Sequence, residues 1–430
     1  MKGLCCFWGQ IIAYNNKDNI NNNISNNISK NISTNIDTSK YDNINYTEKE
    51  LNSNTITEGG SYELTGNIDS ITINTNEDVE LKLNGVNITS NGPGINIIEA
   101  NSVSIVLIGE NTINSNTTED LDGAIYSKAD LILSGDGTLN IKSNYDGIVS
   151  KDDLIIKSGT YNITTEDDGI RGKDSVTIIN GTFNINSNGD GIKSTNEEDT
   201  SKGYIIINNG TFTINSYNDG ISAISKLEIN DGTFNITTKN SSDSSKGLKS
   251  DNLIEINGGD YTINSKDDGI HSNYNITINN GNITIKSDDD AIHADGLLEI
   301  NNGTINIEAH EGLEATYVKI NDGSIYINAS DDGINAGNKS SDYKVTIEIN
   351  GGSVTIKMGS GDTDGIDSNG NLYINGGIID ITANSPFDYD GESKYTGGTI
   401  IVNGTETNTI TNQMMGGNMN NINMNRRMMR

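Results

Sequence analysis

The sequence predicts an all-β fold: a single-stranded, right-handed parallel β-helix of about 13 coils with roughly 22 residues each. The tripeptide Asp-Gly-Ile recurs along most of the chain, and the steps from Gly147 to Gly169 and from Gly169 to Gly191 are both 22 residues. Short runs of alternating apolar and polar residues, joined by glycine-containing turns, separate these tripeptides. A fixed period of this length is typical of stacked units that cannot bury their apolar faces alone.

One coil can be followed in residues 268–287. Residues 276–278 and 283–285 both have the sequence Ile-Thr-Ile, in which apolar and polar residues alternate as in a strand with one buried face. Three short strands and three turns fit one such coil. Coils ~4.8 Å apart would then make a rod roughly 60 Å long.

The turns carry the pattern Ile-Asn-x-Gly. Asparagine tolerates the left-handed conformation of a tight bend, and its side-chain amide can pair with the same amide on the next coil. We therefore predict a structural ladder of asparagines and assign it no ligand. Its members are Asn208, Asn230, Asn257, Asn279, Asn301, Asn321, Asn350 and Asn375.

Composition divides the chain into four segments. Residues 1–14 combine a Lys with a short apolar stretch, and we interpret them as the remnant of an export signal, with a misplaced start as the alternative. Residues 15–50 are rich in Asn and Ser, which predicts a disordered linker. Residues 51–411 form the predicted β-helix, and residues 412–430, rich in Met, Asn and Arg, a flexible tail.

The chain is strongly acidic. Its 59 acidic and 28 basic residues give a formal net charge of −31. This balance argues against nucleic acid as a partner, because such binding needs clustered Lys and Arg, and it favours cations or cation-bridged ligands. No apolar run reaches the length of a membrane span, so we expect no membrane insertion, and we expect a monomer. Cys5 and Cys6 are the only cysteines, which leaves the repeats without a Cys-based metal site.

A residue that recurs once per coil becomes a row in space, so the aspartates before glycine form a carboxylate ladder. A single Asp-Gly pair is explained by turn chemistry alone. Doubled and tripled carboxylates on successive coils instead favour Ca²⁺, which takes about six to eight oxygen ligands in loose geometry. We expect the ion first between residues 288 and 335, where carboxylates are densest. The predicted metal ligands are Asp167, Asp168, Asp190, Asp267, Asp268, Asp288, Asp289, Asp290, Glu311, Asp331 and Asp332.

An outward row is predicted beside this ladder, because the residue after each Gly-Ile points away from the core. The row contains the only Arg before residue 426 and two of the three His. A cationic stripe beside a Ca²⁺-loaded edge suits a linear polyanion, and the alternative is a set of ordinary exposed residues on a strand. The predicted carbohydrate-binding residues are Arg171, Lys193, Lys249, His271, His293, Glu314 and Asn335.

Several runs together carry a resemblance to a known family. They lie at residues 124–128, 146–153, 168–174, 289–295, 310–315 and 330–336. Over about residues 55–400 the chain resembles the bacterial extracellular carbohydrate-binding β-helix family. This resemblance implies a pectate-lyase-like solenoid, an association with calcium, binding of cellulose and acidic sugars, and an extracellular or cell-surface location.

We therefore expect a non-catalytic protein that binds acidic, polygalacturonate-like, or cellulosic polysaccharide at the cell surface in a calcium-dependent way. A polysaccharide lyase is the first alternative, because Arg171 or Lys193 could supply the base for β-elimination of a uronate. A structural surface rod or adhesin is the second. An unbroken ladder offers no distinguished carboxylate pair for glycoside hydrolysis.

Overall fold

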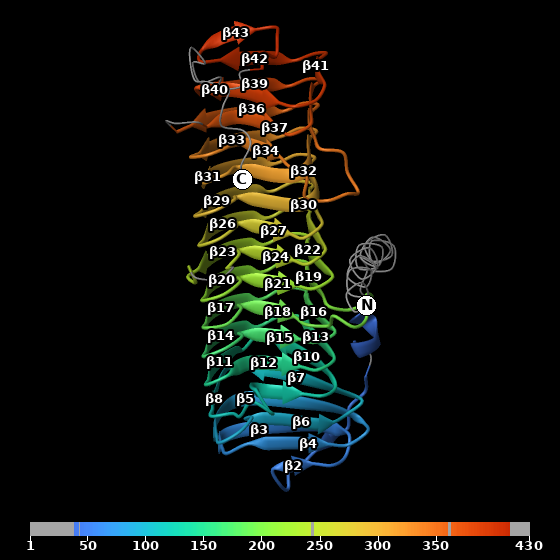
Figure 1. Cartoon of the computed structure of the whole chain (residues 1–430). Coiled ribbons are helices and arrows are strands. Elements are labelled where there is room, and N and C mark those ends of the chain that lie inside the picture. The colour runs from blue at the N-terminus through green and yellow to red at the C-terminus, as the bar shows by residue number, and fades with distance from the viewer. Residues whose placement is uncertain (1–37, 43, 242–244, 360–362, 413–430) are drawn as a thin grey trace, which may run out of the picture.

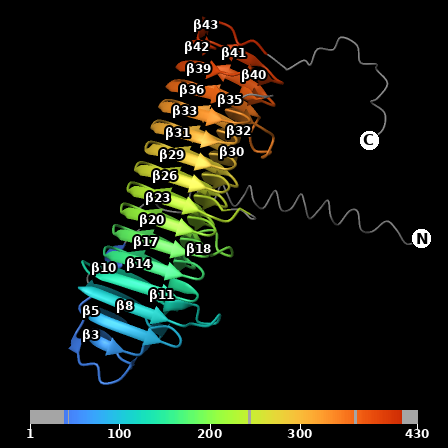
Figure 2. The same ribbon diagram turned by 90° about the vertical axis from the view of Figure 1, so that its left-hand side faces the viewer.

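The computed structural model describes residues 38–42, 44–241, 245–359 and 363–412, and these residues wind into one long solenoid (Figure 1). Apart from one 3₁₀ turn, η1 (Thr38–Tyr41), every regular element in this described part is a strand. Strands of successive coils pair in parallel, and the coils stack along one axis (Figure 2). The predicted parallel β-helix is confirmed. No helix in the described residues is long and apolar enough to cross a membrane.

Three ladders of paired strands form the faces of the solenoid. The corner ladder carries the Asp-Gly-Ile tripeptides. It consists of β2 (Thr55–Ile56), β4 (Ile71–Asn74), β6 (Ile95–Glu99), β9 (Gly123–Ser127), β12 (Asp146–Ser150), β15 (Ile170–Gly172), β18 (Ile192–Ser194), β21 (Ile221–Ala223), β24 (Leu248–Ser250), β27 (Ile270–Ser272), β30 (Ile292–Ile300), β32 (Leu313–Ile320), β34 (Ile334–Ala336), β37 (Asp364–Ser368) and β40 (Ser385–Tyr389).

The middle ladder follows the corner ladder along the chain and also includes the second halves of β30 and β32. Its other strands are β1 (Glu48–Lys49), β3 (Gly60–Ile68), β5 (Asp78–Ser90), β7 (Ser102–Ile108), β10 (Asp130–Gly135), β13 (Asp153–Ile156), β16 (Ser175–Ile178), β19 (Tyr204–Ile207), β22 (Lys226–Ile229), β25 (Leu253–Ile256), β28 (Asn275–Ile278), β35 (Thr346–Ile349), β38 (Asn371–Ile374) and β41 (Ser393–Tyr395).

The polar ladder completes each coil and faces the viewer in Figure 2. It contains β8 (Glu110–Ser115), β11 (Thr138–Ser143), β14 (Thr160–Thr165), β17 (Thr182–Ser187), β20 (Thr211–Ser216), β23 (Thr233–Thr238), β26 (Asp260–Ser265), β29 (Asn282–Ser287), β31 (Thr304–Ala309), β33 (Ser324–Ala329), β36 (Ser353–Met358), β39 (Ile378–Thr382) and β42 (Thr399–Val402). An antiparallel strand, β43 (Thr405–Thr407), covers β42 at the C-terminal end.

The core lies inside the three ladders and consists mostly of Ile, Leu and Val. In the coil used above as an example, Ile276 and Ile278 are fully buried, and Ile283 and Ile285 are at most 1% exposed. Their polar neighbours point outward, as the alternation predicts. Burial of each such side chain contributes roughly 1.5–3 kcal/mol to the free energy of unfolding.

An aromatic stack runs through part of this core beneath the polar ladder. Its members are Tyr161, Phe183, Phe212, Phe234 and Tyr261, from β14 to β26. Successive ring centroids are 4.7 to 5.1 Å apart, and the interplanar angles do not exceed 9°. Ring-to-ring contact therefore holds these coils at an even spacing.

The predicted asparagine ladder is present. Each amide donates to the Oδ1 of the preceding asparagine at 2.7 to 3.0 Å, from Asn230 to Asn375. The expectation that asparagine would take the left-handed turn conformation is wrong for these positions. Glycine takes it instead, with φ of 132° at Gly232 and 119° at Gly303. Among the described residues, Asn403 is the only residue other than glycine that has a positive φ.

The solenoid makes contacts with described residues that lie before the predicted boundary at residue 51. Strand β1 pairs with β3, the Tyr41 hydroxyl donates to Asp130 Oδ2 at 2.5 Å, and Asp42 forms an ion pair with Lys157. The last part of the segment assigned to a linker thus contacts the solenoid. The expectations for residues 1–14 and for the tail from residue 413 lie outside the described residues.

Candidate functional site

Aspartates of the corner ladder are buried directly before their glycines. Asp146, Asp168 and Asp190 are at most 6% exposed. Each Oδ1 accepts a backbone N–H from the following coil: the N–H of Asp190 donates to Asp168 at 2.8 Å, and that of Asp219 donates to Asp190 at 2.9 Å. One oxygen therefore joins two coils, while Oδ2 faces the outward row.

Glycine follows these aspartates because the backbone of the next coil passes directly over it. A Cβ at Gly220 would lie 2.5 Å from the carbonyl oxygen of Gly247 and 2.5 Å from Ile236 Cγ2. Real Cβ contacts of that length do not occur. This close approach of the backbones brings successive carboxylates near one another. In one coil the position of the glycine is occupied by Ala291, which is fully buried.

The outward row is continuous in the register of the corner ladder. Its order along the solenoid is Val149, Arg171, Lys193, Ser222, Lys249, His271, His293, Glu314, Asn335, Asp367 and Asp388. The structure thus brings all of the predicted carbohydrate-binding residues into one row beside the ladder.

The cations of this row form ion pairs with the ladder. Arg171 pairs with Asp122 and Asp146. Lys193 Nζ lies 2.7 Å from Asp190 Oδ2 and 3.7 Å from Asp168 Oδ2. Lys249 Nζ lies 3.6 Å from Asp219 Oδ2. The outward row and the carboxylate ladder were predicted as neighbouring sites, and in the structure ion pairs join them.

Sequence reasoning missed three participants. Asp122 precedes Gly123 and could have been found by extending the Asp-Gly pattern by one coil. Lys246 takes the ladder position itself, before Gly247, and pairs with Asp267 and Asp268. Lys339 comes from an insertion after β34, and its Nζ lies 2.7 Å from Glu314 Oε2. Lys246 could have been found from its place in the 22-residue period, whereas Lys339 has no periodic signal.

The outer members of the doubled aspartates are more exposed than the inner ones. Asp288 and Asp289 are exposed whereas Asp290 is buried, and Asp288 Oδ2 lies 2.8 Å from Lys266 Nζ. Asp167 is likewise exposed beside buried Asp168. Burial raises the pKa of Asp168 to about 7, although Lys193 opposes the shift. The predicted metal ligands thus divide into an inner line and an outer line.

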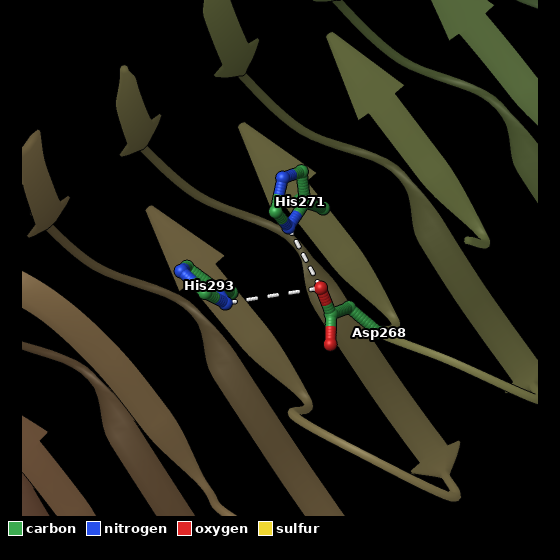
Figure 3. Close-up of side chains that lie close together, drawn as sticks. All are labelled: Asp268, His271 and His293. Carbon is green, nitrogen blue, oxygen red and sulfur yellow. Dashed lines mark hydrogen bonds and ion pairs between the residues drawn. The ribbon is translucent and has the colours of Figure 1, made fainter. Parts of the chain in front are cut away.

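Two histidines occupy neighbouring coils of the row (Figure 3). Asp268 Oδ2 lies 2.7 Å from His271 Nδ1 and 3.8 Å from His293 Nδ1. His293 Nδ1 also lies 2.9 Å from Asp290 Oδ2 and 3.2 Å from Glu314 Oε2. Burial opposes a charged His293, but the surrounding carboxylates outweigh it and raise the pKa of His293 to about 10.

Carboxylates without a cationic partner gather towards the C-terminal end of the row. Burial, with repulsion from Asp364 and Asp388, raises the pKa of Asp367 to about 7. Burial also raises the pKa of Asp332 to about 7, and Asp367 adds to that shift. Within the described ranges, neither Asp332 nor Asp367 forms an ion pair with Lys, Arg or His. Glu311 accepts a hydrogen bond from Asn335 at 3.0 Å.

A second surface lies on the polar ladder, above the aromatic stack. From β14 to β23 it exposes only threonine and asparagine: Thr160, Asn162, Thr164, Thr182, Asn184, Asn186, Thr211, Thr213, Asn215, Thr233, Asn235 and Thr237. Neighbouring amides pair across coils, as from Asn184 to Asn162 at 2.8 Å. This surface is uncharged in a chain with a net charge of −31.

Comparison with known proteins gives a family. A family model described as "Carbohydrate-binding domain-containing protein" matches residues 51–291 and 287–413. Among solved structures, the chain is similar to a polysaccharide lyase-like protein from C. thermocellum, described as a gadolinium derivative, with 28% sequence identity and a TM-score of 0.43. That match covers 51% of this chain and 90% of the other. No curated protein gives a significant match.

The family model spans nearly the whole described solenoid, including the ladder, the outward row and the polar ladder. The carbohydrate-binding character that the sequence indicated is therefore confirmed at the level of the family. The protein belongs to the carbohydrate-binding domain-containing family.

Proposed function

We propose that this protein binds acidic, polygalacturonate-like polysaccharide along the outward row, without cleaving it and with Ca²⁺ as a bridge. Its family membership supports carbohydrate binding in general. Polymers of this class lie outside cells, so an extracellular or cell-surface location is part of the proposal. The proposed Ca²⁺ ligands are Glu311, Asp332 and Asp367.

One observation carries this proposal: among the residues that the structure describes, the protein's own cations accompany the ladder only as far as Glu314. Arg171, Lys193 and Lys249 already neutralise the carboxylates of the earlier coils. Beyond Glu314, the row continues as Asn335 and Asp367, which supply oxygen atoms and no positive charge. Ca²⁺ prefers clustered carboxylate and carbonyl oxygens, and it would relieve the repulsion that adds to burial in raising the pKa of Asp367.

A bound Ca²⁺ with open coordination positions could also bind the carboxylates of a uronic-acid polymer. Equivalent positions recur along the row once per coil, about 4.8 Å apart, which suits a linear ligand. The cations beside Asp168 and Asp190 would attract the same polyanion at longer range, although their ion pairs with the ladder reduce that attraction.

The lyase alternative is less well supported, because both candidate bases are held in their protonated forms. Burial alone would lower the pKa of Lys193, but Asp168 and Asp190 outweigh it and raise that pKa. Asp146 and Asp122 likewise outweigh burial and raise the pKa of Arg171. A base for β-elimination must be unprotonated, and these partners oppose deprotonation.

A neutral, cellulosic polymer is a second candidate ligand, and the uncharged threonine and asparagine surface from β14 to β23 favours it. Hydroxyl and amide groups both donate and accept hydrogen bonds, as the hydroxyls of a glucan do. The aromatic stack beneath this surface keeps its coils evenly spaced. We propose this surface, rather than the row, as the place where such a polymer would bind.

Calorimetric titration of polygalacturonate into the full chain, with Ca²⁺ or with EDTA, tests the first proposal. We expect binding only with Ca²⁺, and at least a tenfold loss in a variant carrying Asp332→Asn and Asp367→Asn. The matched control is Asp380→Asn, which removes a carboxylate from β39 on another face of the C-terminal coils.

Two outcomes would contradict the proposal. If polygalacturonate bound equally well in EDTA, Ca²⁺ would not be needed for binding. If the double variant and the Asp380→Asn control lost the same affinity, the binding site would not lie on the outward row. Release of unsaturated uronides, followed by absorbance near ~235 nm, would instead support β-elimination. Binding of insoluble glucan that is lost in Thr213→Lys with Asn235→Lys would assign the cellulosic ligand to the polar ladder.

A further inference from the structure

We propose a second, chemically different metal site in the middle of the row, where His271, His293 and Asp268 would bind a transition-metal ion of the Zn²⁺ class, with Asp290 as a further ligand (Figure 3). This site goes beyond the proposed Ca²⁺-dependent function. Its ligands come from other coils than those of the proposed Ca²⁺ site and include imidazole nitrogen atoms. Metal binding at this site does not depend on any polysaccharide.

The inner atoms of the cluster lie within 4.8 Å of one another, close enough to reach one ion after small side-chain movements. Ligand atoms about 2.0–2.1 Å from a metal lie roughly 2.9–3.4 Å from one another in octahedral or tetrahedral arrangements. His271 Nδ1 and Asp268 Oδ2 are 2.7 Å apart, and Asp290 Oδ2 and His293 Nδ1 are 2.9 Å apart. The longer 3.8 Å separation between His293 Nδ1 and Asp268 Oδ2 closes the group.

The outer nitrogen of His271 provides a second, independent indication. His271 Nε2 lies 2.8 Å from Asn273 Oδ1, whereas His293 Nε2 lies 3.3 Å from Asp295 Oδ1 without forming a hydrogen bond. The acceptor at Nε2 of His271 holds a proton on that nitrogen, so a metal that displaced the proton on Nδ1 would meet a lone pair facing the ladder. Metal-binding histidines are commonly oriented in this way by an acceptor on the far nitrogen.

Without a metal, a proton on Nδ1 lies between each imidazole and its carboxylate, and a bound metal ion would displace that proton. In nearby coils the ammonium groups of Lys193 and Lys249 occupy the corresponding place. Imidazole differs, because a neutral imidazole is itself a ligand. Nitrogen donors favour Zn²⁺, Ni²⁺ or Cu²⁺ over Ca²⁺, so the two metal sites would select different ions.

The test uses untagged full-length protein, stripped with EDTA and then saturated with Ca²⁺, and titrates Zn²⁺ by calorimetry. We expect one tight equivalent of Zn²⁺. Co²⁺ in place of Zn²⁺ should give visible d–d absorption that reports nitrogen ligation. Replacing both histidines by lysine should weaken Zn²⁺ binding at least a hundredfold.

This lysine variant is chosen because the equivalent position in nearby coils already carries Lys193 and Lys249. The ion pairs with the ladder can then form as they do there, so His271→Lys with His293→Lys is expected to fold with an unchanged β-sheet spectrum. His310→Ala, which removes the remaining histidine of the chain, is the matched control and should leave the tight equivalent in place.

Undiminished Zn²⁺ affinity in the double lysine variant would overturn the proposal, as would a loss of the tight equivalent in the His310 control. A Co²⁺ spectrum without nitrogen ligation would do the same. The variant with Asp332→Asn and Asp367→Asn should keep its Zn²⁺ site, so failure of the calcium proposal and failure of this one remain distinguishable.

Discussion

The two oxygens of a ladder aspartate have different partners. Oδ1 of Asp190 accepts the backbone N–H of Asp219 at 2.9 Å, and Oδ2 lies 2.7 Å from Lys193 Nζ. The first contact joins coils, and the second neutralises charge. The repetition of aspartate is thus explained by structure before any ligand is considered, and a bound cation would add to a role that the carboxylate already has.

This division of roles can be measured at Asp190. Asp190→Asn keeps an oxygen acceptor but loses the charge, whereas Asp190→Ala loses both. We expect the alanine variant to be less stable than the asparagine variant by about 1–3 kcal/mol, because a buried backbone N–H is left without its acceptor. Thermal melting of both variants checks this. Equal melting temperatures would mean that the backbone contact contributes nothing.

A pH effect is expected from a different pair of carboxylates, Asp152 and Asp174, which directly precede strands β13 and β16 of the middle ladder. Burial, together with a hydrogen bond to Asp174, raises the pKa of Asp152 to about 6. The folded protein therefore binds more protons there than the unfolded chain does, so stability falls as pH rises from about 4 to about 6. Asp152→Asn should flatten this part of the profile and raise the melting temperature at pH 7. Exposed Asp136→Asn is the control, and no difference between the two variants would contradict the assignment.

At the scale of elements, the polar ladder and the aromatic stack belong to the same strands. Phe212 lies 4.7 Å from both Phe183 and Phe234, measured between ring centroids, and is 1% exposed. The uncharged outer surface of these strands is therefore supported from within. The even spacing of the outward side chains from coil to coil therefore depends on the even spacing of the aromatic rings beneath them.

Phe212→Ala is expected to lower stability by about 3–5 kcal/mol, because it leaves a cavity and interrupts the stack. Phe212→Leu should cost less, since it keeps most of the apolar volume. Thermal or denaturant melting gives the comparison. If the two substitutions were equally costly, the stacking geometry rather than the filled volume would account for the loss.

The period of the sequence predicts the strands, the ladder and the row, because each depends only on spacing along the chain. It does not predict Lys339, whose insertion reaches back to Glu314 by a path that no repeat describes. The pairing of Lys193 with two ladder aspartates was also missed. A residue pattern shows that a side chain points outward, but not that it bends over a neighbouring carboxylate.

At the scale of the whole molecule, Ca²⁺ is expected to raise the melting temperature. An ion that binds only the folded row stabilises it by about 2.7 kcal/mol at a concentration 100 times its dissociation constant. Asp332→Asn with Asp367→Asn should remove most of this increment and should itself melt higher than the unmutated chain in EDTA, since carboxylate repulsion is relieved. An unchanged melting temperature with EDTA and with Ca²⁺ would leave the C-terminal carboxylates without a metal role.

The asparagine ladder gives the rod an electrical direction. Every amide from Asn230 to Asn375 donates towards the N-terminal end, so the side-chain dipoles lie head to tail along the axis and polarise one another. The series ends inside the rod, because Asn375 Oδ1 accepts a hydrogen bond from the Thr396 hydroxyl at 2.9 Å and several coils precede Asn208. The direction of the side-chain dipoles is therefore an internal property of the middle coils, and a substitution such as Asn301→Asp, which removes one amide donor, would interrupt it between Asn279 and Asn321.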